Sequence, residues 1–185
     1  MQFYPKFLVE DGHRFAPTQH KQWFGVEVRE LKKGYRAAFA AEHIPKGSTI
    51  FQEGGTVLSS VADVPWEMAY PVLITDSLYL APTDFNKPDA GCFLNHHCES
   101  NVARIGGLVT VAKKEIFPGT ELTLDYATLI AGLDNWTLNC ECGSPVCRKI
   151  IKGTDWQNPI LARALWMEWL PHIQRKILNE PCIKI

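Results

Sequence analysis

The sequence has no long apolar run and almost no net charge, and each absence excludes a class of function. Its longest apolar stretches are far shorter than the roughly 20 residues that cross a bilayer, so we expect no transmembrane helix and no membrane partner. Nineteen basic residues nearly balance twenty acidic ones. This balance gives no electrostatic case for direct nucleic-acid binding. The oligomeric state stays open.

The N-terminus also lacks the basic and then apolar layout of a secretory signal. We therefore expect an intracellular protein, cytoplasmic or nuclear, in a reducing environment. This bears on the six cysteines, whose even number would also suit disulfides in a secreted protein. Because the chain is long for a disulfide scaffold and a C-x-C pair bridges poorly, metal binding is favoured over disulfides.

Short alternating stretches between Gly and Pro turns dominate the pattern, clearest at 108–112 and 121–126. A helix is predicted from about Pro159 to about Leu178, broken or bent at Pro171. The fold class is therefore α+β and mostly β. The other predicted elements are a helical turn from Val64 and strands at 26–28, 37–40, 49–51, 56–58, 73–74 and 78–80.

Three cysteines lie within eight residues, in a C-x-C-x4-C pattern with a Gly-Ser-Pro turn. Thiolates this close together can converge on one cation, and a structural zinc ion takes four ligands in a tetrahedron. One ligand must therefore come from elsewhere in the chain. The cluster is Cys140, Cys142 and Cys147, and the candidates for the fourth ligand are Cys92, Cys98, Cys182, His96, His97 and His172.

Three segments resemble the signatures of the SET-domain methyltransferase family, in the family's order and spacing. Residues 93–101 contain the pattern N-H-x-C-x-x-N, residues 121–126 read E-L-T-L-D-Y, and residues 140–147 are similar to the post-SET zinc loop. Weaker similarity is found at 34–47, and Gly153 to Trp156 resembles a tail of compact bacterial-type members. The resemblance covers about residues 26 to 156.

This resemblance implies a SET fold, with several small curled sheets, a C-terminal pseudoknot, a post-SET zinc loop and a C-terminal helix. The pseudoknot would bring the Asn-His segment beside the Asp-Tyr segment. The implied organisation is an N-terminal extension over 1–25, a SET domain over 26–130, a post-SET region over 131–156 and a helical extension over 157–185.

The family transfers a methyl group from S-adenosylmethionine to a lysine nitrogen, so the resemblance implies that cofactor and Zn²⁺. It assigns Cys98 as the fourth zinc ligand and Tyr126 as the catalytic residue. Tyr70 and Tyr79 are candidates for a second tyrosine in the lysine channel. Without the motifs, each tyrosine would be read as a packing residue and Cys98 as a small buried hydrophobe.

The resemblance also assigns residues to the cofactor, where Asn95, His96 and Tyr126 would bind it. Trp136 would cap the adenine or cover the substrate. The turn where the family commonly has G-x-G, so that the backbone can approach the ligand, falls here on Tyr35, Arg36 and Ala37. The plainer alternatives are an Asx turn with a core histidine, an aromatic side chain under a loop, and an exposed turn.

Leu124 departs from the family, because many members place Phe or Tyr there to limit the number of methyl groups. The substrate therefore stays open between a protein lysine and a small-molecule amine. A third possibility is a binding module that keeps the fold without turnover.

Overall fold

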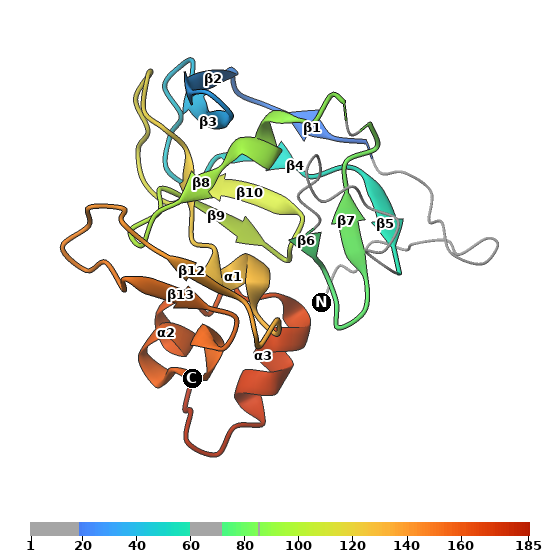
Figure 1. Cartoon of the computed structure of the whole chain (residues 1–185), viewed down its shortest axis with the longest axis vertical. Helices are drawn as coiled ribbons and strands as arrows, with labels where there is room; N and C mark the ends of the chain where they lie inside the picture. The colour runs from blue at the N-terminus through green and yellow to red at the C-terminus, as the bar shows by residue number, and fades with distance from the viewer. Residues whose placement is uncertain (1–18, 60–71, 85) are drawn as a thin grey trace.

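The structure is a computed structural model that describes residues 19–59, 72–84 and 86–185. Residues 1–18 of the predicted N-terminal extension, the predicted turn from Val64 and Tyr70 lie outside these ranges. Among the described residues, no helix is long and apolar enough to cross a membrane. The described chain forms five small sheets and short helices (Figure 1), which confirms the mostly β prediction.

Most strands lie in two antiparallel sheets. In β4 the consecutive side chains of Ile50 and Phe51 are both fully buried and belong to one core with Val102 of β9 and Ala112 of β10. Strand order is β1–β4–β10–β9 in one sheet and β5–β7–β6 in the other. The strands are β1 (Lys21–Gln22), β4 (Thr49–Gln52), β5 (Thr56–Leu58), β6 (Val72–Leu73), β7 (Tyr79–Ala81), β9 (Val102–Ile105) and β10 (Val109–Ala112).

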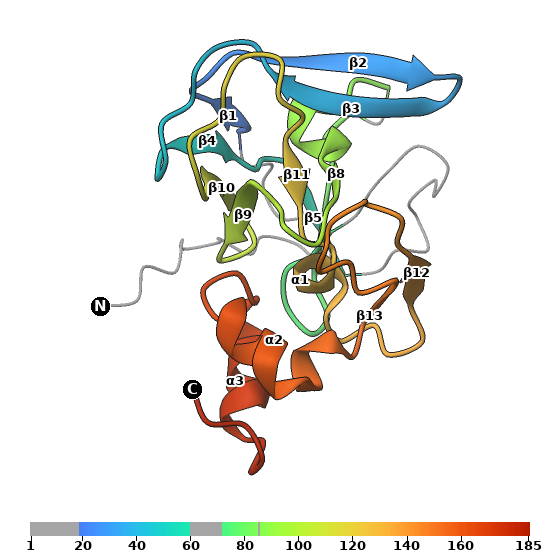
Figure 2. The ribbon, with the colours of Figure 1, turned by 90° about the vertical axis from the view of Figure 1, so that its left-hand side faces the viewer.

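A long hairpin of β2 (Val26–Lys32) and β3 (Tyr35–Ala40) extends from one end of the molecule (Figure 2). Its turn contains Gly34 at a φ of 78°, a conformation that glycine adopts without a steric cost. The turn predicted at Tyr35, Arg36 and Ala37 is therefore wrong, whereas their role in cofactor binding stays a prediction. Tyr35 to Ala37 are the first residues of β3, because the chain has already reversed at Gly34.

The Asn-His and Asp-Tyr segments lie side by side, as the resemblance implied. They form a parallel pair of β8 (Asn95–His96) and β11 (Thr123–Leu124). Asn101 stabilises the pair, because its amide donates to Glu121 O at 2.7 Å and accepts from Thr123 N at 2.8 Å. The strand predicted over 121–126 is shortened to two residues, since Asp125 accepts from Ala127 N and turns the chain into α1 (Ala127–Ile130).

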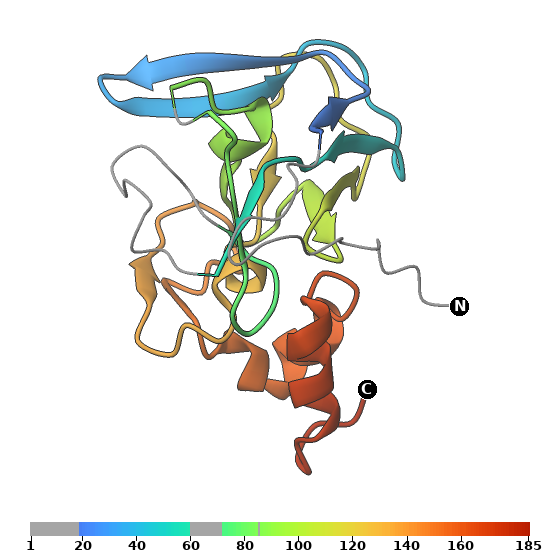
Figure 3. The same cartoon turned by 90° about the vertical axis from the view of Figure 1, so that its right-hand side faces the viewer.

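The C-terminal region forms two helices, which confirms the predicted break at Pro171. They are α2 (Pro159–Ala164) and α3 (Pro171–Leu178), each with proline in its first turn, where no backbone donor is lost. They lie at the end of the molecule opposite the hairpin (Figure 3). Trp169 and Ile173 belong to a second core, which also contains Ala127 and Ile151.

Several short elements were missed by the sequence reading. Each is short, and β9 carries a buried arginine that obscures its pattern. Besides β1, β8, β9 and α1, they are β12 (Thr137–Asn139), β13 (Ile150–Lys152) and the 3₁₀ turns η1 (Ala90–Phe93) and η2 (Asp155–Gln157).

Gly153 follows β13 and packs against the backbone of Leu133, and we expect Gly153→Ala to destabilise the fold by at least about 2 kcal/mol. The added Cβ would overlap the carbonyl oxygen of Leu133, which is backbone and cannot rotate away. The control is Gly119→Ala, which meets no atom within 4 Å and should cost only about 1 kcal/mol for its positive φ. Urea unfolding measures both, and equal losses would contradict the packing argument.

Candidate functional site

Four cysteines converge at one end of the β12–β13 pair. The Sγ atoms of Cys98, Cys140, Cys142 and Cys147 all lie within 4.8 Å of one another. The distance from Cys140 Sγ is 3.9 Å to Cys98 Sγ and 3.7 Å to Cys147 Sγ. A tetrahedral zinc ion with Zn–S bonds of about 2.3 Å places its sulfur atoms about 3.8 Å apart. The donor set therefore fits zinc, with Cys98 as the ligand from outside the loop.

Backbone pairing and one hydroxyl shape the cysteine loop. The antiparallel register pairs Asn139 with Ile150, and Cys140 N donates to Lys149 O at 2.7 Å. Ser144 Oγ accepts from Val146 N within the loop and donates to Glu99 Oε2 at 2.6 Å. Since Glu99 follows Cys98, the loop is attached to the segment that supplies the fourth ligand.

The thiols differ in their tendency to ionise. Burial raises the pKa of Cys140 to about 12. Burial also acts upward on Cys142, but backbone donors at Cys98 and Ser144 outweigh it and lower the pKa of Cys142 to about 6. The cluster thus contains a thiol that ionises near neutral pH, which is the form that binds a metal.

Arg148 connects the cluster to the segment that ends at Tyr126. Its backbone N–H donates to Cys98 Sγ at 3.4 Å, and its guanidinium lies 2.5 Å from Asp125 Oδ1 and 3.7 Å from Asp155 Oδ2. Burial acts to lower the pKa of Arg148, but Asp125 outweighs it and the pKa is raised. Arg148 therefore stays charged and balances part of the thiolate charge.

His96 lies between the cluster and Tyr126. Its Nδ1 accepts from Tyr126 N at 3.1 Å, so the ring proton is on Nε2, which lies 3.5 Å from Cys98 Sγ. Burial lowers the pKa of His96, which keeps the ring neutral. Both ring nitrogens are therefore occupied by the protein, and His96 orients Tyr126 through its side chain.

Tyr126 is held at two points. Besides its backbone bond to His96, its hydroxyl donates to Leu94 O at 2.9 Å. The Tyr126 ring centroid lies 5.5 Å from that of His96. The hydroxyl is thus fixed directly beside the segment that contains Asn95.

The start of β3 lies against Asn95. The Asn95 amide donates to Arg36 O at 3.2 Å and to Glu121 Oε1 at 2.9 Å. The Arg36 guanidinium lies 4.3 Å from the Phe93 ring centroid and is exposed. Burial, with Glu121 nearby, raises the pKa of Tyr35. The structure therefore brings Arg36 next to Asn95, whereas Ala37 is fully buried.

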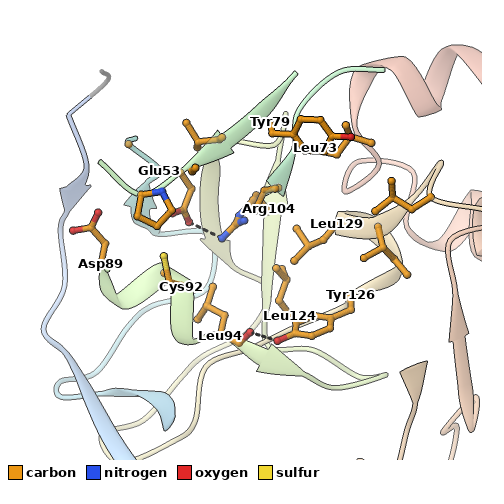
Figure 4. Close-up of a pocket in the computed structure, with 18 of the residues that line it drawn as sticks. Glu53, Leu73, Tyr79, Asp89, Cys92, Leu94, Arg104, Leu124, Tyr126 and Leu129 are labelled. Carbon is orange, nitrogen blue, oxygen red and sulfur yellow. Dashed lines mark hydrogen bonds and ion pairs between the residues drawn. The ribbon is translucent and has the colours of Figure 1, made fainter. Parts of the chain in front are cut away.

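Tyr126 also lines a cavity of about 420 Å³ (Figure 4). Tyr79 and Trp136 line it together with Tyr126, and Leu124 and Leu129 contribute apolar surface. Three of the predicted aromatic residues thus share one cavity. Tyr70, the other candidate for the channel, lies outside the described residues.

Polar residues of this cavity were missed by the sequence reading. Glu53 and Arg104 line it and pair at 2.9 Å, and Asp89 and Cys92 lie nearby in its wall. Burial raises the pKa of Cys92 to about 11, so its thiol stays neutral. The available signal was Arg104 alone, which lies inside an apolar stretch and, if buried, needs a partner; the sequence around Glu53 carries no such signal.

The comparisons with known proteins agree with this geometry. The SET domain family model matches residues 36–127. This chain is a SET-domain protein. The match ends before the cysteine loop, so the metal centre depends on the sulfur geometry alone.

Three relatives show the extent of the similarity. A histone-lysine N-methyltransferase, H3 lysine-4 specific, from Mycosarcoma maydis is 28% identical over 127 residues, which is 61% of this chain and 9% of that protein. The methyltransferase domain of human SETMAR is 24% identical with a TM-score of 0.54, over 70% of this chain and 58% of that one, and supports the fold alone. KRYPTONITE, in complex with mCHG DNA and SAH, is 29% identical with a TM-score of 0.53, over 71% of this chain and 30% of that one. The chain therefore spans less than two thirds of each relative.

We expect the purified chain to contain about one zinc ion, because four thiolates complete a tetrahedron. Cys98→Ser removes one thiolate and should weaken zinc binding at least tenfold. The matched control is Cys182→Ser, since Cys182 is exposed and outside the cluster. Competition with a coloured chelator measures the affinity, and equal values for both variants would exclude Cys98 as a ligand.

Proposed function

We propose that this protein is an S-adenosylmethionine-dependent methyltransferase that acts on the side-chain amine of a lysine in a protein. One observation carries the proposal: the Tyr126 hydroxyl lies in the wall of a largely apolar cavity and bonds to Leu94, the residue before Asn95. This contact supports an amine site in the cavity, beside the segment that we propose for the cofactor. Support for the substrate class comes from a relative named as a histone-lysine methyltransferase.

The residues around Asn95 have the groups that the cofactor needs. Arg36 offers a guanidinium to its carboxylate, and Asn95 Oδ1, which has no partner among the described residues, offers an acceptor to an amino group. When bound, S-adenosylmethionine supplies a methyl group on a positively charged sulfur. A zinc-bound cysteine loop, linked to Tyr126 through His96, would hold one wall of this region in place.

The apolar lining of the cavity would favour the deprotonated form of the substrate amine. A free lysine has a pKa of about 10.4, so deprotonation at pH 7 costs about 4–5 kcal/mol. The apolar walls at Leu124 and Leu129 disfavour the charged form and lower this cost. Tyr126 can orient the neutral amine, because a hydroxyl that donates to one partner can also accept from another.

Incubation with labelled S-adenosylmethionine and a cell lysate tests the reaction. We expect label on lysine side chains of protein. Label in the small-molecule fraction would favour a free amine as the substrate. Failure to bind the cofactor would favour a binding module without turnover.

Tyr126→Phe tests the role of the hydroxyl. We expect methyl transfer to fall at least about a hundredfold, because the amine loses the group that aligns it. Cofactor binding, measured by calorimetry, should be retained, since the variant keeps the ring and the backbone bond to His96. Tyr79→Phe is the comparison and should cost less. An unchanged rate in Tyr126→Phe would make Tyr126 a packing residue.

A further inference from the structure

The cavity beside Tyr126 has a polar end that the proposed reaction has not used. Glu53 follows β4 and Arg104 lies in β9, and their side chains are 8% and 5% exposed. Arg104 Nη2 and Thr110 Oγ1 both donate to Glu53 Oε1, each at 2.9 Å. One oxygen of the carboxylate is therefore fully engaged, and the side chain is held in one position.

The second oxygen, Glu53 Oε2, has no hydrogen-bond partner among the residues that the structure describes. It lies against Gly91, where an added Cβ would be only 2.7 Å away. Glycine at this position leaves room in the wall of the cavity, which both residues line. Glu53 Oε2 is accessible from the cavity, and a carboxylate oxygen without a donor favours a ligand that donates hydrogen bonds.

The charge of the cavity favours a cation. Among the described residues that line it, the carboxylates of Glu53 and Asp89 face one guanidinium, that of Arg104. Two negative charges against one positive charge leave the lining negative by one. A primary ammonium carries three donors and one positive charge, and it matches both the open oxygen and this charge.

The apolar surface of the cavity suits the stem of the same group. Leu73, Leu124 and Leu129 line the cavity together with Glu53 and Arg104. A lysine side chain can pack its four methylene groups on such a surface while its charged head reaches a polar site. Figure 4 shows Glu53, Arg104 and Tyr126 around the same cavity.

We propose that Glu53 binds the terminal ammonium of the acceptor lysine through Oε2 and so positions it in the cavity; this inference rests on the proposed function. Glu53 is a positioning residue and not the base. Its carboxylate holds the ammonium as the lysine enters the cavity. The ammonium then gives its proton to water, and the neutral amine is the form that Tyr126 orients for transfer. Arg104 and Thr110 fix the carboxylate that does the binding.

The first test is Glu53→Gln, which keeps the size of the side chain and removes its charge. We expect the KM for a lysine-containing protein substrate to rise at least tenfold, with a smaller change in kcat and unchanged cofactor affinity. The matched control is Glu168→Gln. Glu168 is also 8% exposed and pairs with Lys113 at 2.6 Å, but it does not line the cavity, so its KM should not change.

A second variant separates substrate binding from folding, because Glu53→Gln leaves the Arg104 charge buried without its partner. The double variant Glu53→Gln with Arg104→Gln removes both charges. If Glu53 serves only as the partner of Arg104, the double variant recovers the wild-type KM, and the inference is overturned. If Glu53 binds the ammonium, the KM stays high although the stability measured by urea unfolding is recovered.

Binding of n-butylamine, measured by calorimetry, tests the inference without any methyl transfer. The wild type and Glu168→Gln should bind it alike, and Glu53→Gln at least tenfold more weakly. If the wild type transfers methyl groups but all three proteins bind the amine equally well, the role of Glu53 is overturned and the proposed function is not. Glu53-dependent amine binding without transfer to any protein would contradict the proposed function and still support the amine site.

Discussion

The parallel pair of β8 and β11 is the interaction on which the site depends. Each strand has only two residues, and so small a pair is not stable by itself in water. Asn101 supplies what the backbone lacks, because its one amide group binds both Glu121 and Thr123. Leu122 and Leu124, both fully buried, attach the same segment to the core. Without this pair, residues 30 apart in the chain would not form one site.

The cysteine cluster and Tyr126 are connected by two routes that begin at Cys98. One passes through the His96 ring to the backbone of Tyr126, and the other passes through Arg148 to Asp125. Both routes consist of buried or half-buried polar groups, whose bonds are costly to break. A metal ion at the cluster would therefore fix the position of Tyr126 as well as that of the loop. A metal bound at the cluster would thus stabilise the position of Tyr126 in addition to the C-terminal region.

Much of the site could be predicted from the sequence where the signal was local. The spacing of Cys140, Cys142 and Cys147 indicated a metal cluster, and Pro171 indicated the break between two helices. The turn predicted at Tyr35 to Ala37 was wrong, because Gly34 reverses the chain before Tyr35 and places these residues in β3. The strand over 121–126 was too long, because Asp125 starts a turn that its alternating neighbours hide.

The sequence by itself determined the chemistry that the chain offers: three clustered thiols for a metal, an Asn-His segment and a segment that ends in tyrosine. Only the tertiary structure decided which groups meet. Tyr79 and Trp136 share a cavity with Tyr126, and Glu53 pairs with Arg104 across 51 positions of the chain. Neither the shared cavity nor the ion pair can be recognised in the local sequence. A charge can be buried only where the fold brings a partner of opposite charge beside it. The residue types decide which groups can bind a ligand, and the packing of distant strands decides which of these groups lie together in one site.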